Sequence, residues 1–237
     1  MKKYIVKLIR KEDVAFKTVS FYLEKPAGFS FKAGQYLKLS LIHPKEQDFR
    51  GNVRSFSIAS LPEDPFLMVT MRIRRSPFKN ELLELPLGAE VEILGPISML
   101  SLKSEDTAAV FLAGGVGAAA ARPMIIEALD QGRPGNIYLF NSNRNKKDIP
   151  FFEEFSQLQK LNFQYVPNIT RKSKEDSEWT GERGYIDEKM IRKYVENPEK
   201  AAYFLIGPSV FMWSMFKLVK SLGVKESQIS FDEYTGY

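Results

Sequence analysis

The sequence predicts two domains, an N-terminal antiparallel Greek-key β-barrel over residues 1–102 and a C-terminal α/β domain over residues 103–237. The first hundred residues contain short alternating strands separated by regular turns, a pattern typical of antiparallel barrels. From residue 107 onward, buried strands alternate with helices, which indicates a parallel sheet with crossover connections. A chain of 237 residues, 44% of them hydrophobic, is long enough to give each domain its own core.

In the N-terminal half the apolar residues repeat every second position, so this half is predicted to consist mainly of strands. Strands are expected over residues 3–9, 14–24, 31–39, 54–60 and 66–74. The exception is the segment 76–83, which predicts a short helix. The first backbone N–H groups of such a helix have no partner within it and are able to bind a phosphate.

In the C-terminal half, strands are expected over residues 108–113, 136–140, 162–168, 201–206 and 228–231, and helices over 118–129, 184–195 and 210–222. Gly114, Gly115 and Gly117 form the turn between the first of these strands and the first helix. Glycines at this place let the backbone approach a pyrophosphate that lies over the helix N-terminus. A glycine-rich turn of this kind can also be purely structural.

Composition excludes several classes of function. The chain has no cysteine, so disulfides, iron–sulfur ligation and thiolate redox centres are excluded, and electron chemistry requires a bound organic cofactor. Its single histidine, His43, lies in a polar turn, so we predict neither a metal site nor a Ser-His-Asp triad. The net charge of +5 is dispersed without a basic-aromatic stripe, so we expect no nucleic-acid partner. Apolar runs fall short of the roughly 20 residues of a membrane-spanning helix, and we expect a cytoplasmic protein without membrane insertion.

The segment Arg54-Ser-Phe-Ser-Ile-Ala-Ser60 places an arginine, an aromatic ring and hydroxyl groups on one predicted strand. Side chains alternate along a strand, so Arg54 and Phe56 are expected on one face and Ser55 and Ser57 on the other. A guanidinium can clamp a phosphate, an aromatic ring can lie on a flat ring, and a hydroxyl can hydrogen-bond a ring nitrogen. These are the contacts that a flavin nucleotide needs, although an ordinary sheet edge would show the same pattern.

This segment resembles the Arg-x-Tyr/Phe-Ser flavin motif of the ferredoxin-NADP reductase family. Three further segments follow in the family's order: residues 111–117 resemble its nicotinamide-nucleotide loop, residues 206–208 its Cys-Gly-Pro element and residues 233–237 its aromatic C-terminus. The resemblance covers nearly the whole chain and includes no fused ferredoxin domain. It implies that the barrel binds FAD and that the C-terminal domain binds NADPH or NADH.

The resemblance also implies roles for individual residues. Ser57 would hydrogen-bond near flavin N5, Glu233 is the acid nominated near the flavin, and Tyr237 would cover the flavin face that the nicotinamide must reach. The flavin site would also comprise Arg54, Ser55, Phe56, Met71, Arg72, Ile73, Lys79 and Asn80. The coenzyme site would comprise Gly115, Val116, Gly117, Asn143, Arg144, Gly207 and Pro208. Arg144 is placed to pair with a 2′-phosphate, which favours NADPH over NADH, although an arginine can also stack on adenine.

Three positions depart from the family pattern. Ala120 stands where the family has a proline, Ile206 replaces the cysteine before Gly-Pro, and Phe78-Lys-Asn80 replaces a Gly-x-x-Ser/Thr sequence at the start of the predicted short helix. The last departure bears on pyrophosphate binding and leaves FMN open beside FAD. The missing cysteine bears on the rate of hydride transfer rather than on the type of reaction.

The function expected from the resemblance is hydride transfer from NAD(P)H to bound FAD, followed by electron transfer to a separate acceptor protein. Because the chain has no cysteine, the one-electron centre would belong to that partner, such as a ferredoxin, a flavodoxin or an oxygenase component. A free-flavin or ferric-complex reductase would use the same sites. A non-catalytic flavin- or nucleotide-binding regulatory subunit is the alternative of another class.

Overall fold

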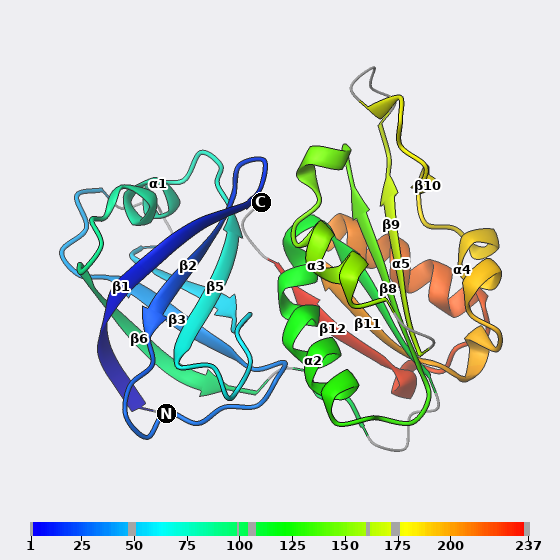
Figure 1. Cartoon of the computed structure of the whole chain (residues 1–237), viewed down its shortest axis with the longest axis horizontal. Helices are drawn as coiled ribbons and strands as arrows, with labels where there is room; N and C mark the ends of the chain where they lie inside the picture. The colour runs from blue at the N-terminus through cyan, green and yellow to red at the C-terminus, as the bar shows by residue number, and fades with distance from the viewer. Residues whose placement is uncertain are drawn as a thin grey trace.

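The computed structural model describes residues 2–46, 51–98, 100–103, 108–159, 162–171 and 176–234. Within these ranges the chain forms an antiparallel six-stranded sheet followed by a parallel six-stranded sheet. The two sheets belong to two domains that lie side by side (Figure 1). This arrangement confirms the predicted fold class.

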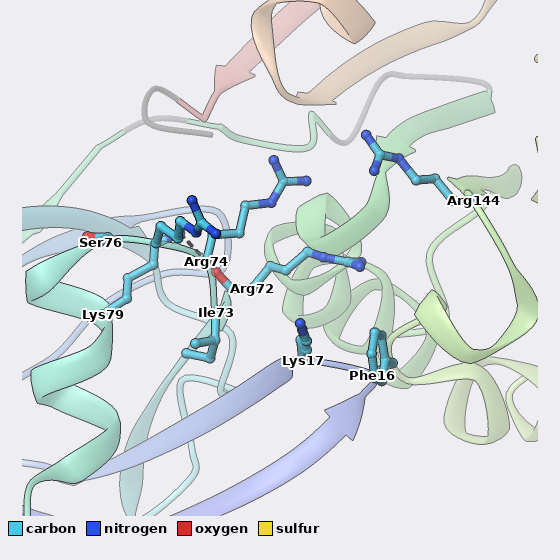
Figure 2. A pocket seen from close by; sticks show the side chains of 9 residues that line it. Phe16, Lys17, Arg72, Ile73, Arg74, Ser76, Lys79 and Arg144 are labelled. Atoms are coloured by element: carbon cyan, nitrogen blue, oxygen red, sulfur yellow. Dashed lines mark hydrogen bonds between the residues drawn. The ribbon is translucent and has the colours of Figure 1, made fainter.

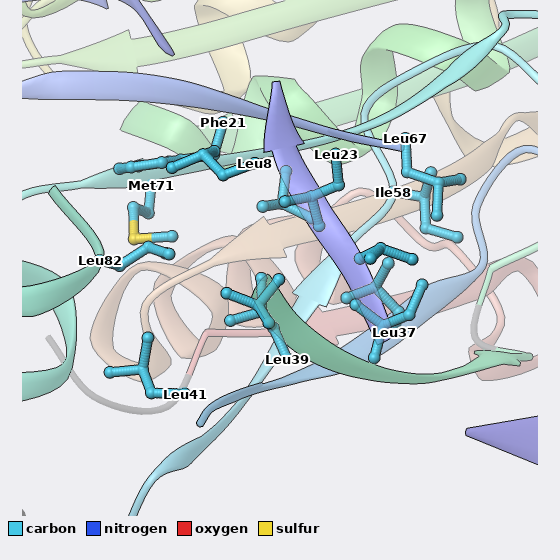
Figure 3. Close-up of a cluster of buried hydrophobic side chains, with 14 of the residues drawn as sticks. Leu8, Phe21, Leu23, Leu37, Leu39, Leu41, Ile58, Leu67, Met71 and Leu82 are labelled. Atoms are coloured by element: carbon cyan, nitrogen blue, oxygen red, sulfur yellow. The ribbon is translucent and has the colours of Figure 1, made fainter. Parts of the chain in front are cut away.

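The N-terminal sheet is barrel-like and has the strand order β4-β3-β6-β1-β2-β5. Its strands are β1 (Lys2–Ala15), β2 (Thr18–Glu24), β3 (Tyr36–Leu41), β4 (Val53–Ser57), β5 (Phe66–Arg72) and β6 (Glu90–Ile97). Alternating residues of these strands point inward, and Leu8, Phe21 and Leu39 are completely buried among them (Figure 3). Helix α1 (Pro77–Glu84) adds Phe78 and Leu82 to this core.

The first two strands differ from the prediction. β1 extends to Ala15, past the expected strand end at residue 9, and the turn at Phe16 and Lys17 lies within the segment 14–24 that is expected as one strand. The rest of that segment, residues 18–24, forms β2. Lys17 has a positive φ of 52°, the left-handed conformation that this tight turn requires. A register shift between Leu8 and Arg10 interrupts the pairing of β1 with β2 close to the expected strand end at residue 9.

The C-terminal sheet is parallel and has the strand order β10-β9-β8-β7-β11-β12. Its strands are β7 (Ala108–Gly114), β8 (Asn136–Asn143), β9 (Phe163–Ile169), β10 (Glu182–Arg183), β11 (Ala202–Gly207) and β12 (Ile229–Glu233). The helices are α2 (Ala118–Asp130), α3 (Phe152–Gln157), α4 (Glu188–Tyr194) and α5 (Ser209–Ser221). Short 3-10 helices lie at η1 (Gly115–Gly117), η2 (Lys146–Asp148), η4 (Pro198–Lys200) and η5 (Glu226–Gln228).

Helices cover both faces of this sheet (Figure 1). Residues of α2 and α3 pack on the face that carries Phe111, and residues of α4 and α5 pack on the face that carries Val110. Both faces of β7 are therefore buried, which explains why its sequence is continuously apolar rather than alternating. No described helix is both long enough and apolar enough to cross a membrane.

Polar and apolar contacts join the two domains. Arg122 of α2 donates a 2.8 Å hydrogen bond to the carbonyl of Ala59 in the N-terminal domain. An apolar cluster, in which Ala59 packs with Val116 and Ala119, spans the same junction. The predicted domain boundary after residue 102 lies in the connection between β6 and β7. The described parts of the two domains thus meet through buried contacts, and groups from both can contribute to one site.

Candidate functional site

The flavin-motif segment lies on β4 and continues beyond it. In this strand Arg54 and Phe56 share one face, as predicted, because both contact the ring of Phe78 on α1. The Phe56 and Phe78 rings stack with their centres 6.1 Å apart, and the Arg54 guanidinium carbon lies 5.0 Å from the centre of the Phe78 ring. Phe56 thus packs against the barrel's own helix, and contact between its ring and a flavin stays a prediction.

Ser57 points the other way, toward the C-terminal domain. Its hydroxyl donates a 2.7 Å hydrogen bond to the carboxylate of Asp232 on β12, 175 residues further along the chain. Asp232 is only 5% exposed. Burial raises the pKa of its carboxyl group, while the hydrogen bond from Ser57 acts to lower it. A hydroxyl and a buried acid from different domains are therefore held together at the domain junction.

Asp232 is the acid next to Ser57, and it directly precedes Glu233, the acid nominated near the flavin. Glu233 instead accepts a hydrogen bond from the hydroxyl of Ser209 on α5 and is exposed. Successive side chains of a strand point to opposite faces, so Asp232 and Glu233 have different neighbours, and a place for Glu233 near the flavin stays a prediction. Tyr237 lies outside the described residues. The aromatic residue of this segment that the structure does describe, Tyr234, packs against the apolar cluster at the domain junction.

The predicted coenzyme loop forms the turn between β7 and α2. Gly115 has a φ of +56°, and an added Cβ on Gly117 would lie 2.5 Å from the carbonyl oxygen of Ile206. Gly207, at the end of β11, lies beside Gly114 and precedes Pro208. The structure thus brings the predicted segments 115–117 and 207–208 together at the carboxyl ends of neighbouring strands, where open α/β sheets bind nucleotides.

Two of the departures from the family pattern lie in or under this turn. Ile206 is completely buried, and Gly117 packs on its backbone. Ala120 is 1% exposed in the first turn of α2, where it packs in the core. Neither departure leaves a gap at the turn, because both side chains are enclosed by apolar neighbours.

Buried asparagines lie at the carboxyl ends of β8 and β9, and those of β8 support the same turn. The Asn141 side-chain amide donates to the carbonyl of Gly115 over 3.1 Å, and the Asn143 amide donates to the side-chain oxygen of Asn141 over 2.9 Å. Among the described residues, the side-chain oxygens of Asn143 and Asn168 have no hydrogen-bond donor although both are buried. Buried acceptors of this kind fit the hydroxyl or amide donors of a bound nucleotide.

Asn143 was predicted from the sequence, whereas Asn141 and Asn168 were missed. The signal that identifies them is a polar side chain at the end of an otherwise buried strand.

A cationic pocket of about 510 Å³ lies between the two domains (Figure 2). It is lined by Phe16, Lys17, Arg72, Ile73, Arg74, Arg75, Ser76, Lys79 and Arg144. Six of these nine described residues are lysine or arginine and none is acidic. Such a concentration of positive charge around one cavity favours a phosphate-bearing ligand.

The pocket collects part of the predicted flavin site. Arg72, Ile73 and Lys79 line it, whereas Met71 is buried in the barrel core and Asn80 is exposed on α1 outside the pocket lining. The Lys79 ammonium donates to the carbonyl of Arg72 over 3.0 Å, which positions this lysine at the pocket. The replacement of the family's Gly-x-x-Ser/Thr by Phe78-Lys-Asn80 therefore supplies a cation beside the cavity. These groups fit the phosphates of a flavin nucleotide.

The turn residues Phe16 and Lys17 were missed by the sequence analysis. They reach the pocket only because β1 continues to Ala15 before the chain turns. Arg74 and Arg75 lie two and three positions after the end of β5, and Ser76 precedes the first residue of α1. The signal in the sequence is a run of three arginines in the four positions 72–75, where the strand ends.

Comparisons with known proteins agree with this geometry. Residues 111–217 match the family model described as oxidoreductase NAD-binding domain. One component of the Na(+)-translocating NADH-quinone reductase of Haemophilus influenzae is 29% identical over 200 residues, which cover 78% of this chain and 49% of that protein. The chain spans about half the length of the curated relatives it matches.

Among solved structures, a ferredoxin NADP+ reductase from Neisseria gonorrhoeae with bound FAD and NADP superposes with a TM-score of 0.81 at 18% identity, over 98% of this chain and 99% of that one. The present chain thus has the fold of a ferredoxin-NADP reductase-like module, and its residues 111–217 match an oxidoreductase NAD-binding domain. The Amycolatopsis cytochrome P450 reductase gives a TM-score of 0.83 at 20% identity, over 99% of this chain and 70% of that one. The resemblance inferred from the four motifs is confirmed, and FAD and NAD(P)H are the cofactors typical of such a module.

Proposed function

We propose that this reductase module accepts hydride from NAD(P)H on FAD held between its domains and then passes the electrons to a separate acceptor protein. The observation that carries the proposal is the 2.7 Å hydrogen bond between Ser57 and Asp232. It supports a reaction centre at the domain junction, because it joins the hydroxyl of the flavin motif to the last strand of the nucleotide domain. A bound flavin would supply the ring that accepts hydride.

In this proposal the residues of the chain bind the cofactor phosphates and orient the groups at the reaction centre. Asp232 accepts a hydrogen bond from the Ser57 hydroxyl and so fixes the orientation of that hydroxyl group. Arg72 and Lys79 hold phosphate on the barrel side of the cationic pocket. Hydride transfer requires close and aligned reactants, so the rigid contacts between the domains are as important as any single side chain.

On the coenzyme side, the turn at Gly115–Gly117 admits a pyrophosphate, and the buried acceptor oxygens of Asn143 and Asn168 bind donors of the nucleotide. We leave the coenzyme as NADPH or NADH. The preference for NADPH depended on Arg144, and this residue lines the cationic pocket together with barrel residues.

For the acceptor we propose a redox protein such as a ferredoxin, a flavodoxin or an oxygenase component. The names of similar proteins support this choice, because they include a cytochrome P450 reductase and the ferredoxin reductase of carbazole 1,9a-dioxygenase. A free-flavin reductase differs only in having a dissociable acceptor. Steady-state kinetics with added flavin separate the two, because a free-flavin reductase turns over with flavin alone.

The test is the visible spectrum of the purified protein before and after anaerobic addition of NADPH or NADH. We expect a yellow protein whose flavin absorbance is bleached by at least one nucleotide. Ser57→Ala is expected to slow bleaching about tenfold, because it removes the hydrogen bond that joins the flavin motif to the nucleotide domain, and a loss of about 1.4 kcal/mol corresponds to a factor of ten. Ser214→Ala, which alters an exposed hydroxyl on α5, is the matched control and should bleach at the wild-type rate. A protein that cannot take up FAD would contradict the proposal.

A further inference from the structure

Arg144 is the one residue among the nine described lining residues of the cationic pocket that comes from the C-terminal domain. It directly follows β8, whereas the other lining residues lie between positions 16 and 79. Figure 2 shows its side chain extending from the C-terminal domain toward the side of the pocket that carries Arg72 and Arg74. Cations of both domains therefore converge on one cavity.

The segment that carries Arg144 is held against the barrel by direct bonds. The backbone N–H of Phe16 donates to the carbonyl of Lys147 over 2.8 Å. The Arg72 guanidinium pairs with Asp148 over 2.8 Å, and this aspartate is only 3% exposed. Asp148 also accepts a 2.9 Å hydrogen bond from the side-chain amide of Asn145. The position of Arg144 relative to the barrel is thus set by barrel contacts of Lys147 and Asp148, three and four residues further along the chain.

Charge then indicates what the pocket binds. Positive groups that face one another across a cavity repel, and the repulsion between two charges 4 Å apart rises from about 1 kcal/mol in water to about 4 kcal/mol near a protein surface. Asp148 offsets the charge of Arg72, but the nine lining residues include no acid. An anion with more than one negative charge offsets the repulsion, and a phosphoanhydride has this property.

We propose that Arg144 binds the phosphates of FAD across the domain boundary, so that the bound dinucleotide links the barrel to the nucleotide domain. This inference rests on the proposed function, because it takes FAD as the ligand of the barrel. It replaces the predicted pairing of Arg144 with the 2′-phosphate of NADPH. The physical reason is that eight barrel residues share the pocket with Arg144, which places the arginine beside the flavin-binding domain.

The first experiment measures FAD release after dilution of the holoprotein, followed by the recovery of flavin fluorescence. Arg144→Ala is expected to raise the dissociation constant for FAD about tenfold and to leave riboflavin, which has no phosphate, unaffected. Arg144→Lys should retain part of the affinity, because it keeps the charge without the bidentate geometry. Lys146→Ala is the matched control: it removes a cation two residues away whose ammonium lies 5.9 Å from the centre of the Phe152 ring, outside the pocket lining.

The second experiment tests the link between the domains. Both tryptophans of the chain, Trp179 and Trp213, lie in the C-terminal domain, so their fluorescence reports the unfolding of that domain. At FAD concentrations that saturate every variant, FAD should raise the thermal midpoint of tryptophan fluorescence in wild type and Lys146→Ala, and raise it less in Arg144→Ala.

Wild-type FAD affinity in Arg144→Ala would overturn the inference, as would a rise in KM for NADPH without a change for NADH, because the arginine would then serve the coenzyme. In both of these cases a wild-type protein that binds FAD and is bleached by NAD(P)H leaves the proposed function intact. A wild-type protein that fails to bind FAD overturns both.

Discussion

At the scale of single residues, the most informative group is the carboxyl of Asp232, which is buried at the domain junction next to Ser57. Burial raises its pKa above the ordinary value of 3.8, so the folded protein holds this proton more tightly than the unfolded chain does. Below the unfolded pKa both states are protonated and the residue costs no stability. As the pH rises through the interval up to the folded pKa, stability falls, and above that interval the full penalty remains.

Asp232→Asn is therefore expected to be more stable than wild type at neutral pH, with the difference vanishing at acidic pH. The amide oxygen still accepts the hydrogen bond from Ser57, so the change removes mainly the buried charge. Urea unfolding at a series of pH values from about 3.5 to 7 measures this difference. Ser57→Ala provides the complementary variant: it removes the bond that favours the ionised acid, so the loss of stability should extend to higher pH. If the free energies of unfolding of wild type and Asp232→Asn change with pH in the same way, Asp232 does not cause the pH dependence.

At the scale of elements, the turn between β7 and α2 depends on the close approach of β11. A Cβ added to Gly117 would lie only 2.5 Å from the backbone carbonyl oxygen of Ile206. Gly115 has a different requirement, a φ of +56° with no neighbouring atom closer than 3.8 Å to an added Cβ. Substitution of Gly117 therefore tests a steric clash, whereas substitution of Gly115 tests the cost of a left-handed backbone.

Gly117→Ala should cost about 1–3 kcal/mol of stability, because the strand or the helix must shift to admit a methyl group. It should also raise the KM for NAD(P)H, since the turn contacts the coenzyme in the proposed site. Gly115→Ala is the matched comparison and should cost about 1–2 kcal/mol through its left-handed backbone alone, without moving β11. Chemical unfolding and steady-state kinetics of both variants check this. Unchanged stability and KM in Gly117→Ala would mean that the turn tolerates the methyl group.

At the scale of the whole molecule, Arg122 forms a hydrogen bond that joins the two domains. Its guanidinium binds the Glu154 carboxylate through two nitrogens, at distances of 2.6–3.0 Å, and binds the carbonyl of Ala59 through the third. The arginine side chain is 16% exposed and the glutamate 33%. The pair is partly buried and one bond of Arg122 crosses the domain boundary. Loss of this arginine therefore weakens the contact between the two domains as well as the packing of α2.

Arg122→Ala is expected to destabilise the protein by about 1.5–3 kcal/mol, the range for hydrogen bonds to charged groups, and to separate the unfolding of the two domains. Differential scanning calorimetry should then show two transitions in place of one. Arg192→Ala is the matched control, because Arg192 pairs with Glu188 over a similar 2.8 Å but is 48% exposed. An exposed pair of this kind contributes about 0.3–0.5 kcal/mol. A single transition at the wild-type temperature in Arg122→Ala would show that other contacts dominate.

The sequence by itself was sufficient for the two-domain fold class, for most strands and helices and for the segments that meet at the nucleotide turn. These features depend on local patterns: a period of two residues along the barrel strands, continuously apolar strands such as β7, and glycine where a turn requires it. The same patterns placed Arg54 and Phe56 on one face of β4, because alternation is a property of the strand itself.

Only the tertiary structure decided which acid meets Ser57 and which cations share a pocket. Asp232 reaches Ser57 through the pairing of β12 with β11 and through the docking of one domain on the other, and neither is encoded within a short window of sequence. Phe16, Arg72 and Arg144 likewise converge from distant parts of the chain. Local sequence determines the direction of a side chain relative to its own element, whereas the neighbours of that side chain depend on how the elements pack, and packing is a property of the complete chain.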